Sequence, residues 1–295
     1  MRVAFLIERR NLYRLLGPVV DRALERGWEI ECWHDWGQPR TGPKGSEFPA
    51  TTPDFRHGRP AVRTFVGADG VAALCAGARP DAVIALRQPA AGEKPMATRW
   101  FGLQYTLDVA ELPEQAIRDP IRRVLVSLGG GCHDAALRTV LAAVDATLDC
   151  VTIDVAPGAR GAMDLGFVPR RPANRAVVHA GLPELRGLIL DSDVAITGAG
   201  MTLYELAATG TPTVTITMVG NQAASAAALS GAGAALSVGI VDGAGRGTAL
   251  ESHLGRLARD VALRAELGRR ARSRIDGRGA VRVAQETERM VGSAR

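Results

Sequence analysis

Short apolar runs alternate with helix-spaced patterns along the first hundred residues. Residues 3–7 read VAFLI, and from residue 12 apolar side chains recur every three or four positions until Gly27. A continuous apolar run predicts a buried strand, and the spaced pattern predicts a helix that starts or kinks at Pro18 and ends at the glycine. The same patterns predict further strands at 29–33, 62–66, 81–86 and 100–105, and a helix at 69–77.

The alternation begins again after a polar, proline-bearing stretch at 112–120. Strands are predicted at 124–128, 151–155, 165–168, 194–197, 213–217 and 234–238. Helices are predicted at 134–146, 183–191, 201–209 and 222–231, and helices rich in Ala and Arg follow to the end. Strands that alternate with helices form parallel sheets, so we expect an α/β protein of two doubly wound domains. In such folds a ligand binds in a cleft at the carboxyl edges of the sheets.

The composition is that of a globular protein with enough apolar residues for two cores. The 295 residues are 46% hydrophobic and 23% charged, and the formal net charge is +5. The last fifty residues, 246–295, hold 12 basic and 6 acidic side chains, so the whole excess lies there. A charge confined to terminal helices does not indicate a nucleic-acid site, and we expect no nucleic-acid partner.

The cysteines and the apolar runs bear on the compartment in which the chain works. Cys32, Cys75, Cys132 and Cys150 lie far apart and form no metal-ligand spacing, which favours a reducing cytoplasm and no metal. No stretch approaches the roughly 20 apolar residues of a membrane span, and the first apolar run is too short for a signal peptide. We expect a cytoplasmic protein, and peripheral contact between its basic C-terminal tail and an anionic inner membrane stays open.

Three glycines follow the strand predicted at 124–128. Gly129, Gly130 and Gly131 stand directly before a predicted helix. Glycines let the backbone approach an anion closely, and a helix start offers free N–H groups and the positive end of the helix dipole. The segment predicts a phosphate-binding loop, with a tight strand-to-helix turn as the structural alternative.

A second strand–loop–helix junction lies at 197–205, with the sequence TGAGMTLYE. Gly200, Met201 and Thr202 would present backbone and hydroxyl donors to a phosphate, and Glu205, one turn into the helix, could accept two hydrogen bonds from a ribose diol. The alternative role of Glu205 is that of a surface carboxylate that stabilises the helix start. The loop lacks the third glycine and the distal acid of the Rossmann dinucleotide fingerprint, which disfavours an NAD enzyme.

Two amides follow the next predicted strand. Asn221 and Gln222 come after Gly220 at the start of another helix. Side-chain amides both donate and accept hydrogen bonds, which suits sugar hydroxyls, and capping of the helix by Asn221 is the alternative.

Together these motifs carry a resemblance to a known family. Residues 191–222, DSDVAITGAGMTLYELAATGTPTVTITMVGNQ, resemble the nucleotide-sugar-binding core of GT-B glycosyltransferases. They are most similar to the C-terminal domains of the peptidoglycan N-acetylglucosaminyltransferase family and of the UDP-sugar hydrolase of the pseudaminic acid pathway. The resemblance extends back to the glycine loop and forward to IDGRGA at 275–280, so it covers about residues 120–285.

The resemblance implies a GT-B-like α/β fold, with two Rossmann-like, doubly wound domains facing a central cleft. It implies an acceptor-side domain at 1–118, a nucleotide-sugar-binding domain at 119–275, and a C-terminal helix at 276–295 that packs back on the first domain. It also implies that Gly129, Gly130 and Gly131 border the diphosphate or the acceptor. The backbone of Leu182 would pair with the nucleobase.

By the same resemblance, Gly200, Met201 and Thr202 hold the α-phosphate at a helix start. Glu205 would bind the ribose hydroxyls, and Asn221 with Gln222 would contact the donor sugar. The family needs no metal and no cofactor for this step, because helix dipoles and backbone amides take up the charge of the leaving diphosphate. The nucleotide sugar, UDP-linked by this resemblance, is a co-substrate.

The N-terminal half departs from the family at one position. Relatives carry a Gly-His pair after the first strand, with the His as candidate base, and the hydrolase form reads G-H-x-x-R. This chain has Asn11 at the His position and Arg14 at the Arg position. Because an amide cannot abstract a proton near neutral pH, the base is another residue, or the activity differs or is lost.

Glu8, at the end of the first predicted strand, is our choice of base, because a carboxylate there could activate an acceptor hydroxyl. Glu8, Asn11 and Arg14 therefore form the candidate catalytic set. His34, Asp35 and Asp108 are the alternative bases, whereas His57, His179 and His253 have no partner that the sequence reveals.

The sequence thus predicts a metal-independent, inverting glycosyltransferase that moves a sugar from a UDP-linked donor to an acceptor of unknown identity. A nucleotide-sugar hydrolase and a non-catalytic nucleotide-sugar-binding protein are the alternatives. The pattern is the same for a monomer and an oligomer, so both states stay open.

Overall fold

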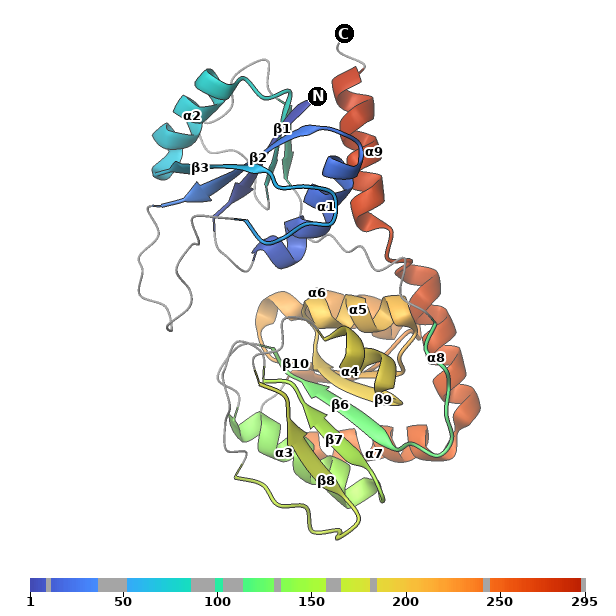
Figure 1. The fold of residues 1–295 in the computed structure, drawn as a ribbon. Helices are drawn as coiled ribbons and strands as arrows, with labels where there is room; N and C mark the ends of the chain where they lie inside the picture. Colours follow the sequence, from blue (N-terminus) through green and yellow to red (C-terminus); the bar gives the residue numbers. More distant parts are fainter. Residues whose placement is uncertain are drawn as a thin grey trace. The chain divides into compact units, whose positions relative to one another are not determined.

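The computed structural model describes residues 1–8, 12–36, 52–85, 99–102, 114–129, 134–157, 166–180, 185–240 and 245–292. Residues 14, 99–102, 221, 240 and 245–246 are described by their backbone alone. The chain divides into two compact units, one of Met1–Asp108 with Arg278–Arg295 and the other of Val109–Gly277. Each unit contains a parallel sheet with helices on both faces (Figure 1).

The first unit contains a five-stranded sheet in the order β3-β2-β1-β4-β5, and all its strands are parallel. Its strands are β1 (Arg2–Ile7), β2 (Glu29–Asp35), β3 (Ala61–Phe65), β4 (Ala82–Ala85) and β5 (Arg99–Gly102). Its helices are α1 (Tyr13–Glu25), α2 (Gly67–Ala78) and α9 (Gly279–Gly292). Because α1 begins at Tyr13, Pro18 lies inside the helix and does not start it.

Strand β1 is buried on both faces because helices cover both sides of the sheet. Val3, Phe5 and Ile7 belong to the core with α1 and α9, whereas Ala4 and Leu6 belong to the core with α2. Successive side chains of a strand point to opposite faces, so a central parallel strand needs an uninterrupted apolar run. The last helix, α9, packs on α1 within this unit.

The second unit contains a six-stranded parallel sheet in the order β11-β10-β9-β6-β7-β8. Its strands are β6 (Arg123–Ser127), β7 (Thr152–Val155), β8 (Arg175–Val178), β9 (Val194–Gly198), β10 (Thr213–Thr217) and β11 (Leu236–Ile240). Its helices are α3 (Asp134–Thr147), α4 (Arg186–Asp191), α5 (Met201–Thr209), the short 3₁₀ helix η2 (Gly220–Gln222), α6 (Ala223–Gly231), α7 (Gly245–Arg259) and α8 (Val261–Arg274).

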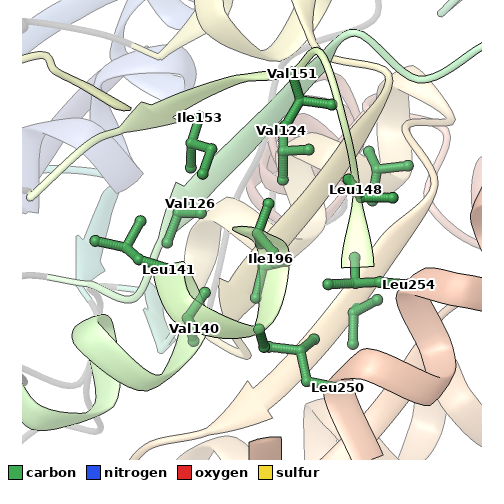
Figure 2. Packing of buried hydrophobic residues seen from close by; sticks show 14 of the residues in the cluster. Val124, Val126, Val140, Leu141, Leu148, Val151, Ile153, Ile196, Leu250 and Leu254 are labelled. Carbon is green, nitrogen blue, oxygen red and sulfur yellow. The ribbon is translucent and has the colours of Figure 1, made fainter. Parts of the chain in front are cut away.

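Helices α3 and α7 cover one face of this sheet, and Figure 2 shows the core between these helices and the sheet. The side chains that meet there are Val124, Val126, Ile153 and Ile196 from the strands and Val140, Leu141, Leu250 and Leu254 from the helices. On the opposite face, Leu125 and Ala195 pack with residues of α4 and α5. The sheet is therefore covered on both sides, and what remains for a ligand is its carboxyl edge.

The strand predicted at 165–168 is wrong in the part that the structure describes. Residues 166–169 form no strand, and the strand that follows β7 in this unit, β8, lies further along the chain. Gly166 has a φ of 53°, in the left-handed region, and Val168 is 84% exposed. Pro169 has no N–H for a ladder. Phe167 gives the segment its apolar character, and it packs on the core from a loop.

Membrane crossing needs a long apolar helix. Within the described ranges no helix combines the required length with the required apolar composition.

Candidate functional site

The candidate nucleotide-sugar residues of the second unit follow three adjacent strands. β10, β9 and β6 are neighbours in the parallel sheet, so the loops after them start at the same edge. The register pairs Ser127 with Thr197, and Ile216 with Gly198. Thr197 Oγ1 also donates to the Ser127 carbonyl oxygen at 2.8 Å. The fold thus brings these loops together at the edge where α/β folds bind ligands.

The turn after β9 is tight, and glycine is needed at its first position. The N–H of Gly200 donates to the Gly198 carbonyl oxygen at 2.8 Å. A Cβ on Gly198 would lie 2.9 Å from the carbonyl oxygen of Leu128, which follows β6. A side chain at this position would therefore push the two loops apart.

Helix α5 starts at this turn. Gly200 is its N-cap, and no side chain caps the helix there. The first N–H groups of a helix have no partner inside the helix, and the positive end of the helix dipole lies beside them. Met201 and Thr202 form this first turn and are half-buried. The arrangement is suited to an anionic oxygen.

Gln222 folds over the same turn from the side of β10. Its Oε1 accepts a hydrogen bond from the N–H of Met218 at 2.8 Å. Its Nε2 lies 3.5 Å from the Cβ position of Gly198 and 3.7 Å from that of Gly200. The amide is thus held by its oxygen and presents its NH₂ group to the glycine turn.

Two more predicted residues lie near this edge. Glu205 is half-buried on α5, one turn beyond Met201. Gly129 is exposed after β6 and has a φ of 96°, a left-handed conformation that glycine adopts without strain. Tyr204, next to Glu205, shares a 2.9 Å hydrogen bond with Ser225 Oγ, which ties α5 to α6.

Several predicted site residues lie outside the described ranges or are described by their backbone alone. Gly130, Gly131, Leu182 and Asn11 belong to the first group. Arg14 lies in the first turn of α1 and Asn221 lies in η2, both without a described side chain. Their contacts stay predictions.

In the first unit, Glu8 follows β1 directly and is half-buried. β1 is the central strand, between β2 and β4, so Glu8 stands in the middle of the carboxyl edge. The register pairs Ile7 with His34, so the end of β2 lies beside it. This position suits a carboxylate that meets a substrate at the sheet edge. Asp108 lies outside the described residues.

His34 lies inside the core, not at the surface. It is 0% exposed, and its Nε2 is 2.5 Å from the hydroxyl of Tyr13. Asp35 is buried as well. A ring without exposed surface does not reach an acceptor hydroxyl, so the geometry does not favour His34 as the base.

His34 and Tyr13 form a buried polar cluster that also includes a thiol, Cys32, on β2. Burial raises the pKa of Cys32 to about 12, although a hydrogen bond with Tyr13 lowers it in part. Burial, with a smaller effect of Cys32, also raises the pKa of Tyr13 above its ordinary value. Both groups are therefore uncharged at neutral pH, and the cluster is a polar part of the core without nucleophilic character.

A cavity of about 530 Å³ opens where β2 and β3 end. Trp36 follows β2, and its backbone N–H donates to the Phe65 carbonyl oxygen at 2.7 Å. The walls are mostly apolar, from Trp36, Phe65, Val66, Leu74 and small residues of α2, and Arg63 adds a guanidinium. Trp36 and Val66 are 47% and 62% exposed, which is typical of a binding surface when the surface is concave.

One polar cluster of the second unit was not predicted from the sequence. His179 Nε2 lies 2.8 Å from Asp154 Oδ1, and Arg123 Nε lies 3.0 Å from Asp154 Oδ2. Asp154 is 2% exposed. The only signal in the sequence is a carboxylate inside the apolar strand VTIDV, since a buried charge needs partners. The partners themselves are far away in sequence.

In the part of the chain that the structure describes, no group of three or more His, Cys, Asp or Glu side chains is placed to hold a metal ion.

No family model matches this sequence. A curated relative is the spore coat polysaccharide biosynthesis protein SpsG of Bacillus subtilis (strain 168), which is 27% identical over 173 residues. The match covers 58% of this chain and 51% of SpsG, so the chain spans about half the length of that relative.

Solved structures match nearly the whole chain. MurG of Acinetobacter baumannii has a TM-score of 0.64 and 13% identity, over 98% of this chain and 99% of MurG. A structure reported as that of a UDP-N-acetylglucosamine 2-epimerase from Listeria monocytogenes also has a TM-score of 0.64, with 11% identity over 99% of this chain and 97% of the epimerase chain. Anabaena HepE, solved with UDP and glucose, has a TM-score of 0.61 and 11% identity over 99% and 100%. With its two parallel α/β units and this likeness, the chain has the GT-B fold.

Proposed function

We propose that this chain is a glycosyltransferase that moves a sugar from a UDP-linked donor to an acceptor, with inversion and without a metal ion. The observation that carries the proposal is the convergence of the glycine turn after β9, the start of α5 and the Gln222 amide at one sheet edge. The likeness to HepE, solved with UDP and glucose, supports the choice of ligand.

The diphosphate binds at the start of α5 in this proposal. Met201 and Thr202 offer backbone N–H groups and one hydroxyl, Gly200 lets the phosphate approach the backbone closely, and the helix dipole favours negative charge. Gly129 to Gly131 border the other side of the diphosphate or the acceptor. Such donors also stabilise the charge that develops on the leaving diphosphate, which is why no metal is required.

The ribose and the donor sugar occupy the two sides of the phosphate. Glu205, one turn into α5, accepts hydrogen bonds from the ribose hydroxyls, and the backbone of Leu182 pairs with the base. Asn221 and Gln222 bind the donor sugar, and the NH₂ group of Gln222 already points at the glycine turn.

The acceptor binds to the first unit. The apolar cavity at the ends of β2 and β3 is a candidate for part of its site. Glu8 takes the proton of the acceptor hydroxyl as its oxygen attacks the anomeric carbon. The bond from that carbon to the β-phosphate oxygen breaks, and its electron pair leaves with the diphosphate. Asn11 orients the acceptor or the sugar, because an amide cannot act as base, and Arg14 adds positive charge.

The experiment is a thermal-shift series with UDP, other nucleotides and UDP-sugars. UDP at about 100 times its Kd stabilises a protein by about 2.7 kcal/mol, which raises the Tm of a chain of this size by several degrees. Glu205→Ala should abolish the UDP shift. Glu251→Ala, an exposed carboxylate on α7, is the matched control and should keep it. A chain that responds to no nucleotide contradicts the proposal.

A second candidate is a nucleotide-sugar hydrolase, favoured by the resemblance of residues 275–280 to the hydrolase group. In that reaction water replaces the acceptor. Incubation with UDP-sugars in the absence of any acceptor separates the two, since a hydrolase releases free sugar at a substantial rate. If UDP binds but neither transfer nor hydrolysis is found, the chain is a nucleotide-sugar-binding protein.

A further inference from the structure

A buried carboxylate organises three strands of the second unit. Asp154 on β7 is 2% exposed, and both of its oxygens have a cationic or N–H partner. Oδ2 lies 2.9 Å from Arg123 Nη2 at the start of β6, and Oδ1 lies 2.8 Å from His179 Nε2 just after β8. Because Arg123 neutralises the buried charge, His179 is not needed for that purpose. The cluster therefore leaves the histidine available for another role.

Asp154 fixes the orientation of the imidazole. A carboxylate only accepts, so His179 Nε2 carries the hydrogen of this bond, and in the neutral ring Nδ1 is then an acceptor. The N–H of His179 also donates to the Val155 carbonyl oxygen at 2.8 Å, so main chain and side chain are both tied to β7. The side chain keeps 25% of its surface exposed. Such a histidine is pre-organised to offer one hydrogen-bond acceptor.

The other charged groups around the cluster are already paired. Arg123 Nη1 lies 3.9 Å from Asp191 Oδ2 of α4. Arg175, at the start of β8, donates through Nε to Thr152 Oγ1 at 2.9 Å. Among the residues that the structure describes, neither group has a contact with His179, and it is Asp154 that orients its ring.

The strand order places His179 on one particular side of the phosphate site. The phosphate donors follow β9, and Gln222 follows β10, on one side of β9. β6, β7 and β8 follow in order on the other side. Neighbouring strands lie about 4.8 Å apart, so β8 is roughly 14 Å from β9. In the proposed function the donor sugar lies at Gln222, so the nucleoside would extend the opposite way, across β6 and β7 toward His179.

We propose that His179 is a base-recognition residue of the nucleotide site and that Asp154 and Arg123 are its positioning residues. This inference rests on the proposed binding of a nucleotide sugar. A neutral imidazole with Nε2–H on Asp154 accepts at Nδ1, so it favours a base that offers an N–H on its Watson–Crick edge. Uracil offers N3–H, whereas the N3 of cytosine is itself an acceptor. His179 therefore makes the site prefer UDP to CDP.

Titration calorimetry of the full chain with UDP and with CDP tests this inference. One hydrogen bond corresponds to about a tenfold change in affinity, so UDP should bind about ten times more tightly than CDP. H179L should weaken the binding of UDP about tenfold and leave the affinity for CDP within about twofold of the wild-type value. H179Q keeps an N–H for Asp154 and adds an acceptor oxygen, so it should restore part of the preference. H253L is the matched control, since His253 on α7 also bonds once, to the Ser237 carbonyl oxygen at 3.3 Å, and should change neither affinity.

Four outcomes overturn the inference. The first is a wild-type protein that binds UDP and CDP equally well. The second is an H179L variant that keeps the wild-type preference for UDP, and the third is an H179L variant that loses affinity for both nucleotides equally. Each of these contradicts base recognition by His179, although UDP binding by the wild type would still support the proposed function. If the wild type binds neither nucleotide, the proposed function fails, and the inference fails with it. If H179L does not unfold cooperatively, H179N replaces it, because its shorter amide cannot span from the backbone to both Asp154 and a base, and the same loss of preference is expected.

Discussion

Gly268 of α8 lies against Gly210, the residue that ends α5. A Cβ on Gly268 would overlap the carbonyl oxygen of Gly210, and Gly210 itself has a φ of 78°, in the left-handed region. One turn further along α8, Arg272 Nη1 donates to the Ala208 carbonyl oxygen at 3.2 Å. The two helices therefore pack backbone against backbone, and this contact holds in place the helix that carries Glu205.

Gly268→Ala should destabilise the protein. The added methyl meets a carbonyl group, not the end of a flexible side chain, so the helices must separate, at about 1–3 kcal/mol. Urea unfolding measures the loss. Gly187→Ala on α4 is the control, because a Cβ there meets nothing within 4 Å. It should be neutral or stabilising by up to about 1 kcal/mol. Equal effects of the two substitutions would contradict the close packing.

Gln222→Glu should weaken UDP binding by at least about tenfold. The new carboxylate keeps an oxygen for the Met218 N–H but places a second oxygen where Nε2 faces the glycine turn. A negative charge there repels the diphosphate, whereas the stability without ligand should change little. Calorimetry with UDP measures the affinity. Gln285→Glu, an exposed position on α9, makes the same change of net charge and should leave UDP binding unaltered.

Alkaline pH should destabilise the fold through Cys32. Burial raises its pKa from 9.0 to about 12, so the unfolded chain loses this proton first. The stability that the neutral thiol provides is complete below about pH 9 and is lost as the pH rises toward 12. Tyr13 acts in the same direction, because burial raises its pKa as well. The free energy of unfolding should fall by on the order of a few kcal/mol over this window.

Cys32→Val tests the cause of that alkaline loss. Valine fills a similar apolar volume and does not titrate, so the free energy of unfolding should fall less steeply between about pH 8 and pH 10.5 than in the parent chain. Urea titrations at the two pH values measure the difference. Parallel pH profiles for parent and variant would show that Cys32 does not cause the loss.

The order of strands and helices is predictable here because both sheets are covered on both faces. β1 and β9 have every core position apolar or small, so they stand out as uninterrupted runs. β8 does not, since Arg175–Val178 is an edge strand that is only half-buried. The apolar pair at 167–168 gave the stronger signal, although Gly166 turns the chain there. Local pattern therefore identifies central strands better than edge strands.

The candidate site is predictable only as separate loops. Glycine turns at 129 and 198–200 and the amide at Gln222 are visible in the sequence, but their proximity depends on the pairing of β10 with β9 and of β9 with β6. The same limit applies to the histidines. His34 is buried against Tyr13, and His179 is bound to Asp154. Tertiary contacts decide both roles, and no spacing along the chain reports them.

Asp145 of α3 holds the loop that leads into β8. Its carboxylate accepts hydrogen bonds from the Arg170 N–H at 2.8 Å and from Asn174 Nδ2 at 2.9 Å, and it is 3% exposed. Burial alone would raise the pKa of Asp145. The hydrogen bonds from Asn174 and from the main-chain N–H groups outweigh it, so the pKa lies below its ordinary value of 3.8.

Asp145→Asn should therefore destabilise the protein most at neutral pH. A lowered pKa in the folded state means that the stabilisation is present above the unfolded pKa and is lost as the pH falls through the folded value. We expect a loss of about 1–3 kcal/mol at pH 7 that shrinks at about pH 3 and below, measured by urea unfolding at both pH values. Asp149→Asn, an exposed neighbour, is the control and should stay within about 0.5 kcal/mol. A deficit of Asp145→Asn that is as large in acid as at neutral pH would mean that the shape of the side chain, and not its charge, holds the loop.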